Sequence, residues 1–202
     1  MREVKLRNIN YGLPITNYAR IMRIAARKGG FAFREMDNFV YICGKIEAMK
    51  QRVYIDTSVM GGYFDTEFAK DTVPFFESLY TGEWTVLLSD QLNKELENAP
   101  ERVRELLKTF SPVYTEYVKM TSEAEHLANK YIEARVVGKT SLTDCQHIAI
   151  ATLYRADILV SWNFKHIVNL GRIRGYNGIN LQQGYNTIEI RTPKEVMHYE
   201  TK

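Results

Sequence analysis

The stretch Arg52-Val-Tyr-Ile-Asp-Thr-Ser58 decides how this chain is interpreted. Its first part is apolar and β-favouring, which predicts a short buried strand over residues 53–55. Asp56 closes the strand and is followed by two hydroxyl residues, Thr57 and Ser58. A carboxylate that ends a buried strand needs a hydrogen-bond partner or a cation, because water cannot neutralise it cheaply. The alternative is a turn acid that bonds nearby backbone N–H groups.

Two more polar residues stand at the ends of apolar segments. Asn163 closes Ile158-Leu-Val-Ser-Trp-Asn163, and Asp144 opens the helix-like run Asp144-Cys-Gln-His-Ile-Ala-Ile-Ala-Thr152. Each has an ordinary alternative, since Asn163 also suits a turn and Asp144 suits the positive end of a helix dipole.

Glu95 is the fourth candidate, about two turns into the helix predicted after a strand at residues 84–88. Its neighbour Glu97 is an alternative, but Glu95 shares the face of Leu92 and is better placed to point inward. Taken alone, Glu95 is equally compatible with a solvated helix surface.

Strand-like and helix-like segments alternate along the chain after residue 52. Strands are predicted at 53–55, 84–88, 158–161 and 187–191, with residues 112–118 extended. Helices are predicted at 66–80, from Pro100 through 107, at 122–137 from a Ser122-x-x-Glu125 capping box, at 144–155 and at 165–170. Residues 57–62 are predicted as a turn. This alternation predicts an α/β fold, with helices on both faces of a parallel sheet. Ligands bind such sheets at the carboxyl ends of the strands, where the four polar residues can converge.

Composition places the chain among ordinary globular proteins. It has 202 residues, of which 45% are hydrophobic and 25% charged, enough for one domain with an extension or for two small domains. Apolar runs fall far short of the roughly 20 residues that span a bilayer, and no signal peptide is visible. Cys43 and Cys145 form no metal-ligand pattern and are predicted to be free thiols, which favours the cytoplasm.

The first 48 residues differ from the rest. An amphipathic helix at 15–28 and a hairpin at 31–43 predict a small helix–hairpin extension (residues 1–48) ahead of the main domain (residues 49–202). Residues 1–50 carry ten Lys or Arg against four Asp or Glu, so the extension is basic. It either contacts nucleic acid or an acidic partner, or is a solvated tail. Met49 is a second possible start, which would leave residues 1–48 out of the native product.

Together these segments resemble the PIN-domain family, and most closely the VapC-type toxin ribonucleases. The residues that carry the resemblance are Tyr54-Ile-Asp-Thr-Ser58, the segment from Ser89 to Leu96, Thr143-Asp144 with His147-Ile-Ala-Ile-Ala151, and Leu159-Val-Ser-Trp-Asn163. The resemblance spans roughly residues 51–192 and implies a three-layer α/β/α sandwich with a central parallel sheet. It also implies hydrolysis of RNA phosphodiester bonds by a water molecule that Mg²⁺ or Mn²⁺ activates.

The resemblance also implies a role for each candidate. Asp56, Glu95 and Asp144 would hold the metal, Asn163 would take the fourth position, and Thr57 or Ser58 would orient a water or phosphate. Many family members have Asp where this chain has Asn163, so the loss of one negative charge should weaken any second metal ion. Basic residues are expected to flank the acids where RNA approaches, with Lys139, Lys165, Arg172 and Arg174 as candidates or as ordinary surface charges.

Other interpretations stay open. The four histidines lack the spacing of a zinc site, and His147 is more typical of a partly buried helix residue than of a ligand. The leading hypothesis is a metal-dependent endoribonuclease that acts on RNA and is the toxin of a type II toxin–antitoxin pair. Its expected protein partner is an antitoxin. The resemblance implies homodimers, and no membrane association is expected. A non-catalytic nucleic-acid or protein binding module is the alternative, and a phosphatase or DNA nuclease on a related sheet is a third.

Overall fold

The computed structural model describes residues 50–199. The chain divides after Lys50, and the structure described below is that of the second unit. The helix–hairpin predicted for residues 1–48, and the boundary at Met49, lie outside the described residues.

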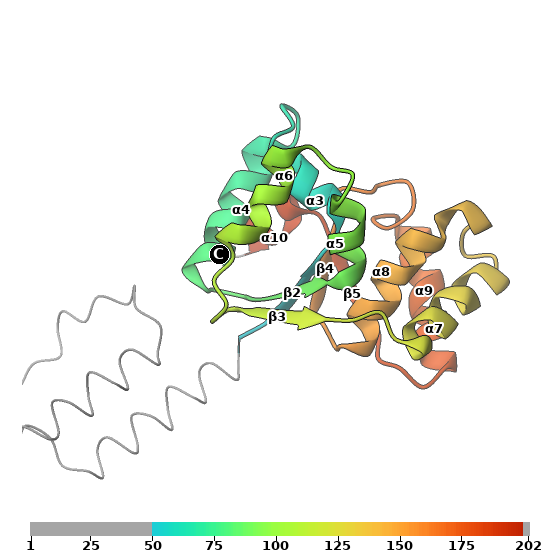
Figure 1. Cartoon of the computed structure of the whole chain (residues 1–202). Coiled ribbons are helices and arrows are strands. Elements are labelled where there is room, and N and C mark those ends of the chain that lie inside the picture. The colour runs from blue at the N-terminus through green and yellow to red at the C-terminus, as the bar shows by residue number, and fades with distance from the viewer. Residues whose placement is uncertain (1–49, 200–202) are drawn as a thin grey trace, which may run out of the picture. The chain divides into compact units, whose positions relative to one another are not determined.

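A five-stranded parallel sheet forms the centre of this unit (Figure 1). Its spatial order is β3-β2-β1-β4-β5, with β1 at Arg52–Ile55, β2 at Thr85–Ser89, β3 at Thr115–Val118, β4 at Ile158–Val160 and β5 at Glu189–Arg191. The chain builds outward from β1 to β3 and then returns to the other side of β1 with β4. The carboxyl ends of β1 and β4 therefore form the switch point at which such sheets bind ligands.

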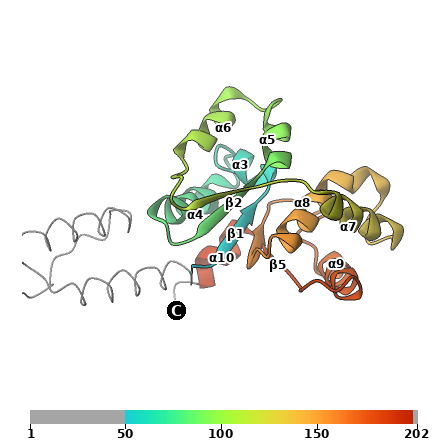
Figure 2. The same ribbon diagram turned by 60° about the horizontal axis from the view of Figure 1, so that its bottom comes forward.

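Helices cover both faces of the sheet, as the alternating side chains of the strands require. Tyr54 and Leu87 belong to one apolar cluster, while Val53, Ile55 and Val86 belong to the other, so consecutive residues face opposite layers. Helices α7 (Ser122–Glu133), α8 (Leu142–Leu153) and α9 (Leu170–Gln182) pack on the first face; α3 (Thr57–Gly62), α4 (Ala69–Thr81), α5 (Asp90–Leu96), α6 (Glu101–Glu105) and α10 (Pro193–Tyr199) pack on the second (Figure 2). Short 3₁₀ helices occupy Leu106–Thr109 and Lys139–Ser141. The predicted α/β/α sandwich with a parallel sheet is confirmed.

The turn predicted at residues 57–62 is wrong, because this segment is helix α3. Asp56 caps the helix by accepting a hydrogen bond from the backbone N–H of Val59 at 3.2 Å. This bond satisfies one of the free N–H groups at the helix start and allows two glycines to stay helical.

The predicted start and end of α7 also need correction. Thr121, not Ser122, caps the helix and accepts from the N–H of Ala124 at 3.1 Å. The helix ends at Glu133, earlier than the predicted Val137. Arg135 follows with φ 58°, and this left-handed conformation stops the helix before Gly138 is reached.

Two helices near the C-terminus were not predicted. No helix forms at residues 165–170; instead α9 begins at Leu170, and α10 follows β5. The buried positions of α9 are Tyr176 and Asn180, so its sequence carries little apolar periodicity. Gly175 allows α9 to approach its neighbours closely, since a Cβ there would lie 2.8 Å from Val136 Cγ1.

Between residues 50 and 199, no helix combines the length and apolar character needed to cross a bilayer.

Candidate functional site

Asp56 lies at the carboxyl end of β1 and is 3% exposed. The hydroxyls of Ser58 and Ser161 each donate to its carboxylate at 2.6 Å, in addition to the capping bond from Val59. Burial raises the pKa of Asp56, although the charge of His147 and the two serine bonds act in the opposite direction. Hydrogen bonds from the end of β4 thus fix a buried carboxylate at the end of β1.

Glu95 extends from α5, which begins directly after β2 with Ser89 as its cap. His147 Nε2 lies 2.8 Å from one carboxylate oxygen, and Gln91 Nε2 donates to the same oxygen at 2.9 Å. The hydroxyl of Thr57 donates to the other oxygen. Burial alone would raise the pKa of Glu95, but the hydrogen bond and charge of His147, with the bonds from Thr57 and Gln91, lower it to about 2. Glu95 is therefore ionised at neutral pH.

A buried chain of hydrogen bonds holds His147 against Glu95. The Tyr54 hydroxyl lies 2.6 Å from His147 Nδ1 and 2.7 Å from Ser89 Oγ. Because an ionised carboxylate only accepts, Nε2–H donates to Glu95, and the Tyr54 hydroxyl, which can donate or accept, bonds Nδ1. This chain, from Ser89 through Tyr54 and His147 to Glu95, links β1, β2, α5 and α8 and is called the Tyr54–His147 relay below.

The signs of this relay in the sequence are weak. His147 follows Asp144 by one helical turn, which places it on the same side of α8, but its sequence context favoured a partly buried helix histidine. It is 2% exposed. Tyr54 was not a candidate at all, because an apolar strand residue is expected in the core. A tyrosine hydroxyl needs a partner when buried, and this was the only available signal.

Asp144 and Asn163 meet where α8 begins and β4 has ended. Asn163 Nδ2 donates to Asp144 Oδ1 at 2.9 Å, and its amide oxygen accepts from the N–H of His166 at 2.9 Å. Burial, together with the charges of Asp56 and Glu95, raises the pKa of Asp144 against the lowering effect of His166 and His147. Asp144 is therefore within electrostatic range of the other two acids.

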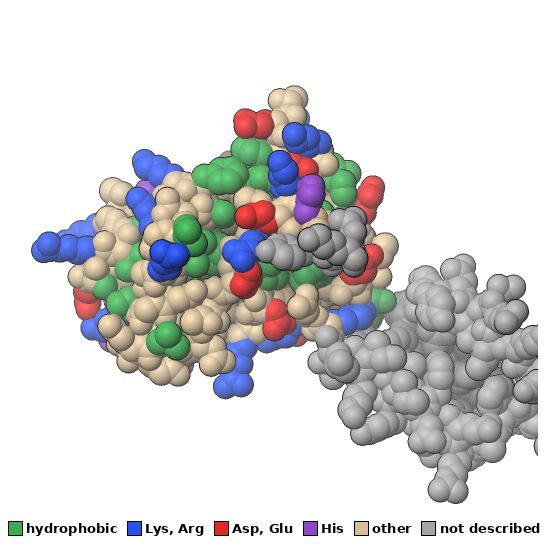
Figure 3. Space-filling view, turned by 180° about the vertical axis from the view of Figure 1, so that it is seen from behind, with side chains coloured by type: hydrophobic (Ala, Val, Ile, Leu, Met, Phe, Trp, Pro, Cys, Tyr) green, Lys and Arg blue, Asp and Glu red, His purple; other side chains and the backbone are tan. Residues whose placement is uncertain are grey.

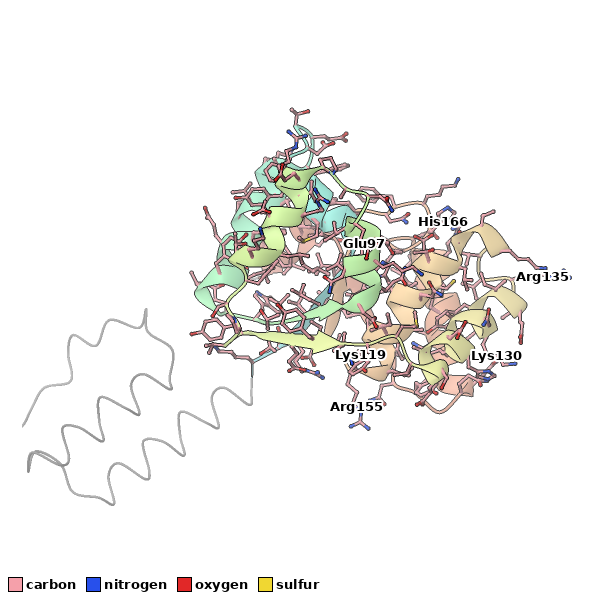
Figure 4. The ribbon with its side chains drawn as sticks, viewed as in Figure 1. Glu97, Lys119, Lys130, Arg135, Arg155 and His166 are labelled. Atoms are coloured by element: carbon pink, nitrogen blue, oxygen red, sulfur yellow. The ribbon has the colours of Figure 1, made fainter. Side chains whose placement is uncertain are left out.

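Of the alternatives weighed from the sequence, the structure favours Glu95 over Glu97 as the inward residue. Glu97 is exposed and caps the end of α5, whereas Glu95 is half-buried and bonds His147. In Figure 4, Glu97 and His166 lie on the same upper side of the molecule, whereas Lys119 and Arg155 extend from the opposite side. Ser58 donates to Asp56 and Thr57 donates to Glu95, so each of the two hydroxyls, one or the other of which is predicted to orient a water or phosphate, is bonded to an acid in this structure.

The four basic residues predicted to lie beside the acids differ in their exposure and contacts. Arg172 is half-buried and donates to His166 Nδ1, which also lies 3.1 Å from Ser141 Oγ. Lys139, Lys165 and Arg174 are exposed. Seen from behind, Lys and Arg side chains are interspersed with Asp and Glu and form no broad basic surface on that face (Figure 3).

The acids converge on one end of the sheet, but not round a common point. Among residues 50–199, no group of three His, Cys, Asp or Glu side chains is arranged to hold a metal ion. Both oxygens of Glu95 are engaged by neighbouring side chains. The donor types nevertheless fit Mg²⁺ or Mn²⁺, because all are oxygens, and a cation would offset the charge that raises the pKa of Asp144.

A polar groove of about 390 Å³ lies beside Glu95, between α5 and the start of α8. Its lining residues carry amide, hydroxyl and charged groups: Gln91, Lys94, Glu95, Glu97, Asn98, Thr143 and Gln146. A polar ligand at this groove would thus contact Glu95 directly.

Comparisons with known proteins give little beyond this geometry. No family model and no curated protein matches the chain. Among solved structures, a chain in the crystal structure of VapBC2 from Rickettsia felis bound to a DNA fragment from their promoter is similar, with 14% identity and a TM-score of 0.44. The match covers 70% of this chain and 98% of that chain.

Proposed function

We propose that the chain is a metal-dependent endoribonuclease of the PIN-domain type. The observation that supports this most directly is that Asp56, Glu95, Asp144 and Asn163 all lie at the end of the sheet where the central strands finish. None of the three acids forms an ion pair with a Lys or Arg of residues 50–199, and histidine is the one basic side chain beside them. Neighbouring acids without a Lys or Arg partner are typical of a site that receives a cation from outside.

Each residue has a distinct task in this proposal. Asp56 and Asp144 supply oxygens to the cation, and Glu95 joins them by giving up one of its present partners. Ser58 and Ser161 hold Asp56, and Asn163 holds Asp144, so that neither acid swings away from the ion. A divalent cation bound here would polarise a water molecule and offset negative charge on the phosphate.

The cleavage test compares a site acid with a surface acid. Wild type is expected to cleave single-stranded RNA with Mg²⁺ or Mn²⁺ and not with EDTA, and Asp56→Asn should lower the rate by roughly 100-fold or more, because it removes a metal ligand. Asp65→Asn is the matched control, since Asp65 is exposed and bonds only the nearby Glu67 N–H. Circular dichroism checks that each variant is folded. Equal cleavage by folded, metal-replete Asp56→Asn would refute the proposal.

A binding module without catalysis is the second candidate, favoured by the engagement of Glu95. In that case the relay would hold Glu95 permanently, and the acids would serve structure alone. Calorimetric titration with Mn²⁺ separates the two functions. Binding at micromolar to low millimolar concentrations that Asp56→Ala abolishes supports the nuclease, and absence of binding supports the module.

The biological setting belongs to the same proposal. We infer a toxin of a type II toxin–antitoxin pair, acting on RNA in the cytoplasm as a homodimer and inhibited by an antitoxin protein. Growth arrest on induction of wild type, and none with Asp56→Asn, is the expected outcome. Analytical ultracentrifugation of the purified chain tests the dimer.

A further inference from the structure

Phe164 is an exposed aromatic ring at the edge of the acid site. It is 51% exposed and directly follows Asn163, the residue that donates to Asp144. Exposure of one apolar side chain is ordinary. What distinguishes Phe164 is that its ring packs against other aromatic rings in the loop that also carries Asn163.

The ring rests on a fixed aromatic base. Its centroid is 5.9 Å from that of Trp162 and 6.4 Å from that of Phe68, and those two rings stack at 4.6 Å. Trp162 is itself held, because its Nε1–H donates to Thr72 Oγ1 at 2.9 Å. Gly62 provides the space, since a Cβ there would lie 2.7 Å from Trp162 Cδ1.

The backbone that carries the ring is also fixed relative to the acids. The N–H of Phe164 donates to the carbonyl of Trp162 at 2.9 Å, and the N–H of Ile167 donates to the carbonyl of Asn163 at 3.0 Å. With the bond from His166 N–H to the Asn163 side chain, these contacts make a tight turn. These bonds fix the backbone of the turn, and the bond from Asn163 Nδ2 to Asp144 Oδ1 joins that turn to the start of α8.

We propose that Phe164 stacks on an unpaired nucleobase of the RNA strand, next to the phosphate that lies at the acids. This inference rests on the proposed nuclease function and adds a residue that holds one base of the substrate. A base held in a duplex offers no free face, so the site would accept single-stranded RNA or a loop and reject a double helix. The exposed Lys165 follows the ring and can meet the phosphate backbone of the same strand.

A nucleobase fits this surface better than a protein partner does. Trp162 is buried and Phe68 half-buried, so Phe164 is the mostly exposed ring of the three. A stable protein interface needs roughly 800 Å² on each side. One exposed ring between a polar amide and a lysine instead matches the flat area and charged rim of a single nucleotide.

The test measures RNA binding by fluorescence anisotropy, with the Asp144→Asn background used to prevent cleavage. The probe is a fluorescein-labelled single-stranded RNA of ten nucleotides, compared with the same strand in a duplex. Phe164→Leu keeps an apolar side chain but removes the ring, and should weaken single-strand binding by roughly tenfold. Phe164→Trp should retain the binding. Tyr117→Leu is the matched control, because Tyr117 is 66% exposed on β3 at the far edge of the sheet.

The outcomes separate this inference from the function on which it rests. If the chain cleaves no RNA yet Phe164→Leu still weakens single-strand binding, the stacking role stands and the nuclease proposal fails. If Phe164→Leu binds single strands as tightly as its parent, or if the duplex binds equally well, the stacking role is overturned and the ring is left for a protein partner. Substitution of 2-aminopurine in the probe gives an independent readout, since stacking on Phe164 should change its fluorescence and Phe164→Leu should abolish the change.

Discussion

The acidic residues at the two ends of the sheet have different hydrogen-bond and ion-pair partners. At the amino end, Asp157 accepts from the backbone N–H of Arg52 at 2.6 Å, and the Arg52 guanidinium pairs with Glu116. At the carboxyl end, Asp56, Glu95 and Asp144 have only hydroxyl, amide and imidazole partners. The acids at the amino end thus connect neighbouring strands, whereas the acids at the carboxyl end have no Lys or Arg partner among the described residues.

Under the proposed function, this difference distinguishes acids that join strands from acids that receive a cation. Both ends have strand-terminal Asp residues, so position on a strand is not sufficient. Asp157 is bonded to the backbone N–H of the neighbouring strand and Glu116 to a guanidinium, whereas none of the three acids at the carboxyl end pairs with a Lys or Arg of the described residues. Sites of function often carry such unfavourable interactions, which other parts of the fold offset.

The largest expected effect comes from exchanging one acid at each end for its amide. Asp144→Asn should lower RNA cleavage by roughly 100-fold or more and, in EDTA, leave the melting temperature unchanged or higher, because it removes a carboxylate that its neighbours repel. Asp157→Asn should retain cleavage but lose about 1 kcal/mol of unfolding free energy, since it weakens a charge-assisted hydrogen bond. Rates and urea unfolding curves on both variants measure this. A loss of stability in Asp144→Asn with full activity would reverse the assignment of the two ends.

A smaller effect is expected in the Tyr54–His147 relay. Tyr54→Phe removes one hydroxyl and leaves His147 Nδ1 and Ser89 Oγ without their partner in a buried setting. We expect a loss of about 1 to 3 kcal/mol of unfolding free energy in urea titration. Tyr131→Phe is the control, since Tyr131 is equally buried but bonds Asn180 on the same face, away from the acids. If Tyr54→Phe also lowers cleavage and Tyr131→Phe does not, the relay positions Glu95 as well as stabilising the fold.

The smallest effect should come from the exposed ion pair at the amino end. Glu116→Gln breaks the pair with Arg52, whose side chain is 29% exposed while that of Glu116 is 44% exposed. Exposed pairs of this kind contribute about 0 to 1 kcal/mol, so the melting temperature should change little and cleavage should be unaffected. A measured loss well above that range would mean that the amino end depends on charge pairing more than its exposure suggests.

The central sheet could be predicted because its signals are local. The run from Arg52 to Asp56 is short, apolar and closed by an acid, and the same pattern ends at Asn163. Strands that alternate with helices leave a parallel sheet as the consistent arrangement, and its switch point then follows from topology. For that reason the sequence predicts that the four polar residues lie at one end of the sheet.

The features that the sequence does not predict depend on contacts between residues that are far apart in the chain. The relay joins Tyr54 to His147, 93 positions apart, and no local pattern specifies that hydrogen bond. Helix α9 is stabilised by close approach at Gly175 and by buried Asn180, neither of which produces an apolar stripe. The arrangement of Glu95 was likewise unpredictable, because its rotamer is chosen by three partners from α3, α5 and α8.

Gly62 ends α3, the helix that Asp56 starts, and it touches the indole of the residue just before Asn163. Residue 62 is consequently a spacer between the end of β1, which carries Asp56, and the end of β4, which carries Asn163. An alanine there would place a methyl group against the indole ring and tilt one half of the site relative to the other, without touching any acid. The packing of α3 against the end of β4 thus requires a small residue at position 62. In related sequences with a larger residue at position 62, we expect a smaller side chain than Trp at position 162.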